Sequence, residues 1–305
     1  MIIRPIPPFR LDFTVWALRR RPRNAIDRWD GTTYRRIVVI GGRVTELAIR
    51  QSGSPAVPRI IVTATPSLRT LSDRRQVESI VEQLLGLQID LSEWYRVARR
   101  DRRLAELADR FRGLKPPRFP TVFEALANAF ACQQLSLVVG LELLNRLAVA
   151  SSVRFGSGAS AHYAFPTPGD VARRRPASLR AIGFSHQKVR ALLALARGIA
   201  TGAIDLDSLP FDSDTEVRAQ LLQLHGVGRW TAEYVSLRGL GRLHVFPGDD
   251  VGAQKSLARW LGRSAPLDYV GVAKAVERWQ PYAGMLYFHL LLDGLSRSGA
   301  LESAA

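Results

Sequence analysis

The spacing of apolar residues changes once along this chain, close to residue 70. From Phe9 to Thr65, apolar and β-branched residues alternate with polar ones or form short runs, a pattern typical of strands. From Ser72 onward, apolar residues recur every three or four positions, which places them on one face of a helix. A chain whose strands come first and whose helices follow is expected to be an α+β protein.

The N-terminal pattern predicts a small β-rich domain over residues 1–70. Strands are expected at residues 34–40, 44–49 and 59–63. The pair Gly41-Gly42 stands between the first two strands. Two glycines in sequence favour the tight turn of a hairpin, because both adopt positive φ without strain.

A large all-α domain is expected over residues 71–305, since 305 residues are enough for two domains. A Ser/Gly-rich stretch at residues 151–164 predicts a surface loop. Helices are predicted at residues 72–85, 104–111, 121–132, 136–150, 187–198, 214–224, 229–239, 252–261, 269–279 and 283–296.

Composition excludes several classes of protein and site. No apolar run approaches the roughly 18 residues of a membrane span, and the first residues lack the pattern of a secretion signal. We therefore expect a cytoplasmic protein without membrane contact. Cys132 is the only cysteine, which excludes an intrachain disulfide, a four-cysteine zinc site and a cysteine-ligated iron–sulfur cluster. The five histidines show no metal-ligand spacing, so we expect no metal and no cofactor.

The charge balance indicates a polyanionic partner. The chain has 43 Lys and Arg against 27 Asp and Glu, a net charge of +16. Such a charge attracts nucleic acid of any base sequence. The alternative is that a GC-rich genome favours arginine codons and makes the chain basic without any functional meaning. Arginine clusters at residues 19–21, 99–103 and 173–175 are expected to be mostly solvated faces, with one or two of them touching phosphate.

A turn between two predicted helices is the first motif with a mechanism. Gly226 and Gly228 are one residue apart, which permits a tight turn and the close approach of another molecule. The following helix would offer free N–H groups and the positive end of its dipole to a phosphate. The alternative is a helix corner whose glycines only permit packing. The residues of this predicted DNA-binding hairpin are Leu224, His225, Gly226, Val227, Gly228 and Arg229.

The segment after the hairpin resembles a known family. Trp230 follows the hairpin, and Asp250 stands twenty positions later, after a Val-Phe-Pro-Gly-Asp stretch. This pattern resembles the helix–hairpin–helix–GPD DNA glycosylase superfamily, and within it the bacterial DNA-3-methyladenine glycosylase II family. The resemblance implies a TATA-binding-protein-like N-terminal sheet and a helical glycosylase domain with its helix–hairpin–helix at about residues 214–239. Further segments similar to the family are residues 123–126, 133–136, 184–189 and 277–282.

The resemblance places Asp250 beside the sugar of the damaged nucleotide. Cleavage of an N-glycosidic bond leaves positive charge on the sugar, and one ionised carboxylate stabilises that charge and orients a water molecule. Asp249 is the second candidate for this role. The alternative is that either aspartate only caps the helix that begins near Gly252.

The resemblance also assigns a base pocket. Family members that cleave the DNA strand carry a Schiff-base lysine at the position of Trp230, and an indole forms no imine. We therefore expect a monofunctional enzyme that releases the base and leaves an abasic site. The predicted walls of the pocket are Trp230, Tyr234 one turn later, and Trp16. Core packing is the alternative role for Trp230 and Tyr234.

Three positions depart from the family. Val251 stands where the bacterial family has an aromatic residue, and Leu291 and Leu292 stand where it has Trp and Tyr. A less aromatic pocket attracts cationic bases less strongly, which leaves room for neutral lesions such as hypoxanthine.

Gln133, Gln134 and Leu135 form the predicted DNA wedge. They lie between two predicted helices and match the loop that the family inserts into DNA. Base flipping costs a few kcal/mol of stacking, which an inserted side chain partly offsets. The alternative is an interhelical turn held by glutamine hydrogen bonds.

These observations predict a monofunctional DNA glycosylase of base excision repair, which flips alkylated purines of the 3-methyladenine type and hydrolytically releases them from double-stranded DNA. We expect a cytoplasmic, nucleoid-associated monomer. The alternatives are a non-catalytic helix–hairpin–helix protein that binds DNA or senses damage, and a bifunctional glycosylase–lyase.

Overall fold

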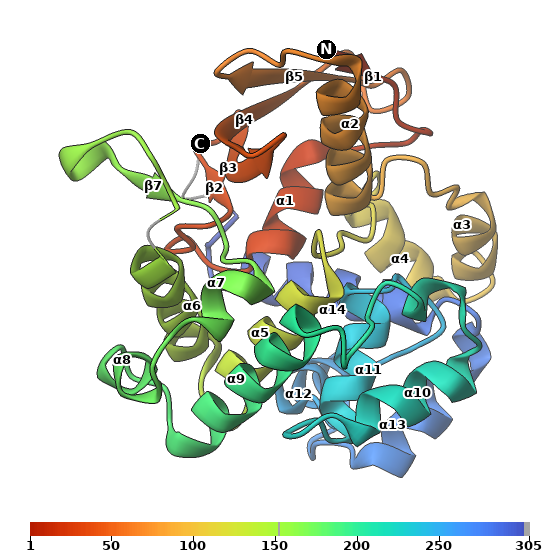
Figure 1. The fold of residues 1–305 in the computed structure, drawn as a ribbon. Helices are drawn as coiled ribbons and strands as arrows, with labels where there is room; N and C mark the ends of the chain where they lie inside the picture. Colours follow the sequence, from red (N-terminus) through yellow and green to blue (C-terminus); the bar gives the residue numbers. More distant parts are fainter. Residues whose placement is uncertain (152, 302–305) are drawn as a thin grey trace.

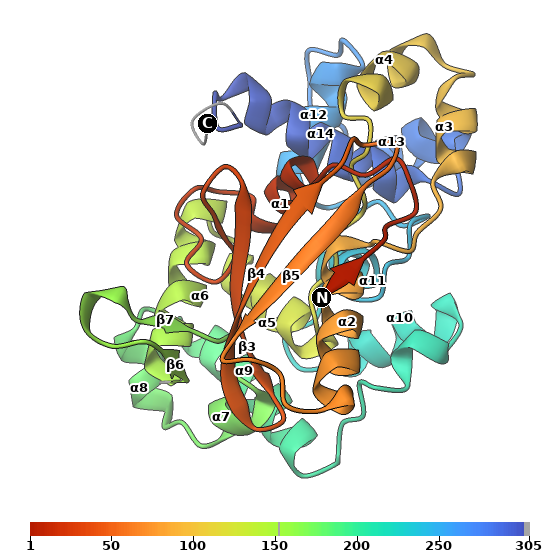
Figure 2. The same ribbon diagram turned by 90° about the horizontal axis from the view of Figure 1, so that it is seen from above.

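The computed structural model describes residues 1–151 and 153–301. An antiparallel sheet occupies the N-terminal part of the chain, and helices make up most of the rest (Figures 1 and 2). The α+β class predicted from the change of period is therefore confirmed. The likeness of the sheet to TATA-binding protein stays a prediction.

The five-stranded sheet has the order β1-β5-β4-β3-β2. Every neighbouring pair is antiparallel, and β3 and β4 meet at the pair Ile40 and Arg43. The turn glycines Gly41 and Gly42 have φ of +52° and +74°, so the predicted hairpin turn is confirmed. The strands are β1 (Ile2–Ile3), β2 (Arg28–Trp29), β3 (Thr33–Ile40), β4 (Arg43–Ser52) and β5 (Arg59–Thr65).

A helix interrupts the segment predicted to be strand-like. α1 (Leu11–Arg19) buries Leu11, Val15 and Leu18 against the sheet, while its other side packs on α14 (Ala283–Arg297). The strand prediction is wrong here. The three buried residues have helical spacing, but β-branched and aromatic neighbours gave a strand-like local pattern, and tertiary packing decided the outcome.

The helix predicted from residue 72 is confirmed as α2 (Leu71–Leu85). Val77, Val81 and Leu84 are buried in the same core as the strands β3, β4 and β5. The division of the chain into two domains at residue 70 stays a prediction. α2 lies beyond that boundary and shares the core of the sheet.

The remaining helices enclose two further cores. One core lies among α5, α6, α9 and α11, and the other among α3, α4, α12, α13 and α14. Every helix predicted beyond residue 100 is present, with ends shifted by a few residues. The helices are α3 (Ser92–Ala98), α4 (Arg102–Arg110), α5 (Val122–Cys132), α6 (Leu137–Ser151), α7 (Pro168–Ala172), α8 (Pro176–Ala181), α9 (His186–Ala200), α10 (Asp214–Gln223), α11 (Arg229–Arg238), α12 (Val251–Trp260), α13 (Tyr269–Val276) and α14 (Ala283–Arg297).

The stretch predicted as a surface loop, residues 151–164, contains a short hairpin. β6 (Arg154–Phe155) pairs with β7 (His162–Tyr163) around a short 3-10 turn. Residue 152 of this stretch lies outside the described residues, as do residues 302–305 at the end of the predicted helical domain. Within the described part of the chain, no helix combines the length and apolar character that crossing a membrane requires.

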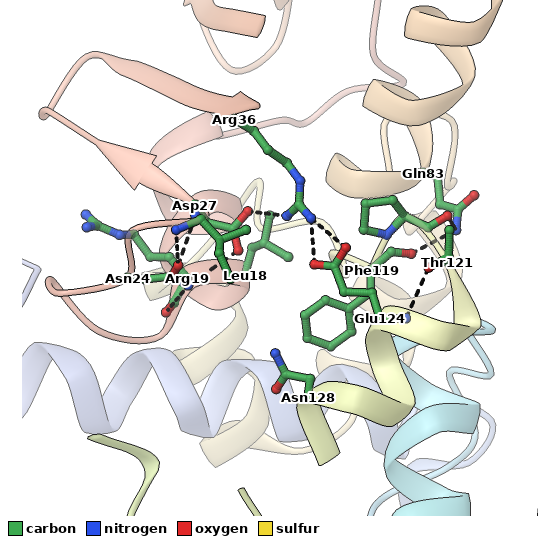
Figure 3. Close-up of polar contacts among 12 residues, drawn as sticks. Leu18, Arg19, Asn24, Asp27, Arg36, Gln83, Phe119, Thr121, Glu124 and Asn128 are labelled. Carbon is green, nitrogen blue, oxygen red and sulfur yellow. Dashed lines mark hydrogen bonds and ion pairs between the residues drawn. The ribbon is translucent and has the colours of Figure 1, made fainter. Parts of the chain in front are cut away.

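A buried ion network joins the sheet to the helices (Figure 3). The guanidinium of Arg36 on β3 donates to Asp27 Oδ1 at 2.5 Å and to both oxygens of Glu124 on α5 at 2.6 Å. The Tyr34 hydroxyl donates to the same Asp27 oxygen at 2.7 Å. All four side chains are buried, so they satisfy one another in place of water.

Arg36→Met is expected to destabilise the fold by about 3–5 kcal/mol, because it leaves two buried carboxylates without their cation. The matched control is Arg35→Met, which removes the neighbouring arginine from an exposed pair with Asp30 and is expected to cost at most about 1 kcal/mol. Urea denaturation of both variants measures the difference. Equal losses of stability would contradict the role given to the network.

Candidate active site

The turn between α10 and α11 spans residues 224–228. Gly226 has a φ of +84°, and a Cβ there would lie 2.7 Å from the Cβ of Ala191. Only glycine satisfies both conditions. Gly228 differs, because a Cβ there would meet no atom within 4 Å. Its missing side chain leaves open space at the surface.

The other hairpin residues divide between core and surface. Val227 is buried and Leu224 is half-buried, whereas His225 and Arg229 are exposed. Gly228 is the N-cap of α11 and provides no side chain to cap it. The first N–H groups of α11 and the positive end of its dipole therefore stay available to an anion.

Asp250 is held at the start of α12 through both carboxylate oxygens. Oδ1 accepts the backbone N–H of Ala253 at 2.9 Å, as the N-cap of the helix. Oδ2 accepts from the indole Nε1 of Trp230 at 3.5 Å and from the hydroxyl of Tyr287 at 3.2 Å. The capping role left open by the sequence is therefore present, and it leaves Oδ2 facing the aromatic residues.

Asp249, the second candidate for the catalytic carboxylate, is engaged elsewhere. Its oxygens accept from Nε and Nη2 of Arg229 at 2.6 and 2.9 Å. The same guanidinium lies over the ring of Tyr269, 3.7 Å from its centroid. Asp249 thus ties its loop to the hairpin and does not share the surroundings of Asp250.

Trp230 and Tyr234 form an aromatic pair on α11. Their ring centroids are 5.3 Å apart and their planes meet at 30°. They are four positions apart, so they lie on the same face of the helix. Trp230 keeps part of its surface exposed, whereas Tyr234 is buried. The structure brings Asp250, Trp230 and Tyr234 together.

The hydroxyl of Tyr234 belongs to a buried group of hydrogen-bonded side chains that the sequence did not predict. Arg20 donates from Nη1 to the Tyr234 hydroxyl at 3.0 Å and from Nη2 to Asn128 Oδ1 at 2.7 Å. The Tyr234 hydroxyl donates to the same Asn128 oxygen at 3.1 Å. Arg19 and Arg20 are only 4% and 5% exposed, so the expectation of a solvated arginine face is wrong for both. No local pattern in the sequence distinguishes Arg20 from the solvated arginines.

Two non-glycine residues in the described chain have positive φ, and both lie at this site. Arg20, which ends α1, has a φ of +62°, and Gln134, in the predicted wedge, has a φ of +55°. Such residues persist where the surrounding structure holds them, and they cluster at functional sites.

Tyr287 of α14 is another site residue that the sequence did not predict. Burial raises the pKa of its hydroxyl well above the ordinary value, and the charge of Asp250 raises it further. The hydroxyl therefore stays protonated and donates to Asp250. Tyr287 lies on a helix that is buried over most of its length, so its position in the apolar pattern carries no signal of this contact.

The three predicted wedge residues lie in different surroundings. Gln133 is partly buried, and its Nε2 donates to the Gly226 carbonyl and to Thr231 Oγ1, both at 2.9 Å. Gln134 is exposed, and Leu135 is 43% exposed. Gln133 thus holds the loop against the hairpin, while Gln134 and Leu135 form its exposed tip.

Trp16 and the three positions that depart from the family differ in burial. Trp16 is 3% exposed in the core formed by α3, α4, α12, α13 and α14, and within the described residues no hydrogen bond or ring contact joins it to Trp230 or Tyr234. Its role as a pocket wall stays a prediction. Val251 is exposed, Leu291 is half-buried and Leu292 is buried.

A separate cavity of about 640 Å³ lies beside α11. It is lined by residues of α10, α11 and α13, including Glu233 and Lys274, and not by Asp250, Trp230 or Tyr234. It shares Arg229 with the hairpin but does not include the carboxylate or the aromatic pair of the candidate site.

The region that holds these residues matches a known family. The HhH-GPD superfamily of base excision DNA repair proteins matches residues 127–281, about half of the chain. The chain belongs to this superfamily. The matched region contains the hairpin, Trp230 and Asp250, so the family resemblance inferred from these residues is confirmed.

Relatives of this HhH-GPD protein are similar over much of their length. A DNA-3-methyladenine glycosylase of Bacillus subtilis (strain 168) is 27% identical over 221 residues, which cover 72% of this chain and 73% of the relative. A putative DNA-3-methyladenine glycosylase of the same organism, YfjP, is 25% identical over 285 residues, which cover 93% of this chain and 95% of the relative. The solved structure of a 3-methyladenine DNA-glycosylase from Archaeoglobus fulgidus matches with a TM-score of 0.82 at 25% identity, covering 97% of this chain and 98% of that one. The shared fold therefore includes the N-terminal sheet.

The two hairpin glycines are expected to respond differently to alanine. Gly226→Ala should destabilise the protein by about 1–2 kcal/mol, because alanine is strained at a φ of +84° and its methyl group would press on Ala191. Gly228→Ala should cost at most about 1 kcal/mol of stability but weaken DNA binding, because its methyl group occupies the open space before α11. Urea denaturation and fluorescence anisotropy with a DNA duplex separate the two effects. A Gly228→Ala variant that binds DNA like the wild type would show that the backbone does not approach this space.

Proposed function

We propose that this protein is a monofunctional DNA glycosylase that hydrolyses the N-glycosidic bond of alkylated purines, of the 3-methyladenine type, in double-stranded DNA. The observation that carries the proposal is the half-buried Asp250 carboxylate, whose Oδ2 faces the aromatic pair. Membership of the superfamily supports base excision repair as the setting, and the names of the relatives support alkylated purines as the substrate class.

Asp250 acts on the sugar. As the base departs, positive charge develops on C1′ and the ring oxygen, and a carboxylate beside them stabilises that state. The attraction is stronger in a partly buried site than in water. The cap bond on Oδ1 and the two donors on Oδ2 hold the carboxylate in one orientation. Asp250 also orients the water molecule that adds to C1′.

Trp230 and Tyr234 receive the extruded base. The exposed part of Trp230 provides a stacking surface, which attracts a cationic base by about 0.5–2 kcal/mol. Tyr234 lies behind it, with its hydroxyl fixed by Arg20 and Asn128. This arrangement limits how deeply a base enters.

The tip of the wedge loop fills the gap that the extruded base leaves in the duplex. Gln134 and Leu135 are the exposed residues of this loop, and Leu135 has the apolar side chain that such wedges commonly use. Two anchors hold the loop. Gln133 binds the hairpin, and Lys188 Nζ donates to the carbonyl oxygens of Ala131 and Gln133 at 2.9 and 2.7 Å.

The hairpin binds the DNA backbone. The uncapped N-terminus of α11 offers N–H groups to a phosphate, and the net charge of +16 adds attraction that does not depend on sequence. We also propose that the protein works as a cytoplasmic, nucleoid-associated monomer and needs no cofactor.

Asp250→Asn is expected to lower the rate of base release by at least about 100-fold, because it removes the charge that stabilises the transition state. Asparagine still caps α12, so the fold and DNA affinity should be retained. The matched control is Asp249→Asn, expected to lose less than about tenfold, because Asp249 pairs with Arg229 instead of facing the site. Free base released from duplexes carrying methylated or deaminated purines is identified by mass.

The same assay separates the two classes of function. Release by the wild type, lost in Asp250→Asn with DNA binding retained, supports the glycosylase. Release from none of the lesions, with DNA binding intact, would support a non-catalytic binding or damage-sensing protein instead.

A monofunctional glycosylase forms no covalent intermediate with DNA, and this can be tested separately. By the family resemblance, Trp230 stands at the position of the Schiff-base lysine. The lysine beside the wedge loop, Lys188, donates to two backbone carbonyl groups. Borohydride should therefore trap no covalent protein–DNA adduct while the base is being released. A trapped adduct that disappears in Lys188→Met would show a glycosylase–lyase that uses this amine.

A further inference from the structure

We propose that Arg20 determines which damaged bases the pocket accepts, favouring neutral bases with a hydrogen-bond acceptor on the edge away from the sugar over cationic bases. The inference rests on the proposed glycosylase function and ranks the purine lesions at the same site, with neutral lesions released at a larger enhancement than cationic ones of the 3-methyladenine type.

The site has opposite charges at its two ends. Asp250 bonds to the indole nitrogen of Trp230 at the end where the sugar would lie. Arg20 bonds to the hydroxyl of Tyr234 at the other end of the aromatic pair. A nucleotide placed with C1′ beside Asp250 and its base along this pair points its far edge toward Arg20.

No carboxylate of the described residues is in direct contact with the charge of Arg20, and Asp27 attracts it only from beyond ion-pair distance. Its partners, Tyr234 and Asn128, are neutral, and within the described residues no carboxylate lies within ion-pair distance of its guanidinium. Its Nε is buried without a partner. Arg36 is buried to a similar degree, but two carboxylates meet it. Since arginine keeps its proton in proteins, a positive charge remains at the inner end of the pocket.

A second buried cation lies near Tyr234. The guanidinium of Arg238 is 5.8 Å from the centroid of the Tyr234 ring, and it donates to the carbonyl oxygens of Ala17 and Leu18. Neither partner carries charge, so Arg238 adds to the positive field that Arg20 creates.

This field acts differently on the two kinds of lesion. A base that already carries positive charge, such as 7-methylguanine in DNA, is repelled by Arg20, and burial keeps that repulsion from being screened. The opposing attraction to the face of Trp230 occurs where water still has access. Hypoxanthine and 1,N6-ethenoadenine are neutral and present a carbonyl oxygen or a ring nitrogen, which accepts a hydrogen bond from the guanidinium of Arg20.

The backbone at Arg20 supports a role for its side chain. It is the residue that ends α1 in the left-handed conformation, where glycine is the usual residue. The alternative role for Arg20 is to anchor the end of α1 to α5 and α11. An anchor affects all lesions equally, whereas a selectivity residue changes the ratio between them.

The experiment measures single-turnover release of hypoxanthine, 1,N6-ethenoadenine and 7-methylguanine from otherwise identical duplexes. Each rate is divided by the spontaneous rate of loss of the same base, because cationic bases leave more readily without any enzyme. The proteins are the wild type, Arg20→Met, Arg20→Lys and Arg59→Met. The last is the control for loss of one positive charge, at an exposed position on β5.

We expect the wild type to show a larger enhancement for the neutral bases than for 7-methylguanine. Arg20→Met should lower the neutral-to-cationic ratio at least tenfold, Arg20→Lys should keep most of it, and Arg59→Met should not change it. Thermal unfolding of each variant verifies that the protein compared is folded.

Two results would overturn the proposal: a wild type that enhances release of 7-methylguanine more than release of the neutral bases, or a folded Arg20→Met with the wild-type ratio. The first result does not depend on whether any variant folds. Failure of the wild type to release these bases, and to release any methylated purine in the assay described above, would instead contradict the proposed glycosylase function itself.

Discussion

The buried guanidinium of Arg36 is the contact on which the rest of this structure depends. It lies between Asp27, in the segment that follows α1, and Glu124 on α5 (Figure 3). A charge removed from water is tolerated only when its partners surround it, so these elements have one relative position that satisfies all three groups. Asn128 is one turn along α5 from Glu124 and accepts from Arg20 and Tyr234. The network thus sets the distance between the sheet and the site.

Asp250 shows how one side chain serves the fold and the chemistry together. Its first oxygen caps α12, and its second accepts from Trp230 and Tyr287. A carboxylate that is already held needs little rearrangement when charge develops on the sugar, which is the condition for strong transition-state stabilisation. Buried tyrosines that stay protonated, such as Tyr287, provide donors without adding negative charge.

Local signals predicted much of this molecule. The spacing of apolar residues predicted strands β3 to β5 and most of the helices beyond residue 100, but not the short helices α7 and α8. The family resemblance, which rests on the glycine turn and the aspartate that follows it, implied the grouping of Asp250, Trp230 and Tyr234. The predictions that failed concern segments whose structure depends on contacts with residues far away in the sequence. α1 is helical because it fits between the sheet and α14. Arg20 lies in an arginine run like the exposed ones, and only its contacts with Asn128 and Tyr234, more than a hundred residues away, distinguish it.

The central claim is that the charge of Asp250 faces the anomeric carbon of an extruded nucleotide. The most direct test compares the affinity of the protein for duplexes that carry either a neutral tetrahydrofuran or a cationic pyrrolidine in place of one nucleoside, the latter imitating the charged sugar of the transition state. The account predicts that the wild type binds the cationic analogue at least about 100-fold more tightly and that Asp250→Asn loses this preference. Equal preference in both proteins would contradict it.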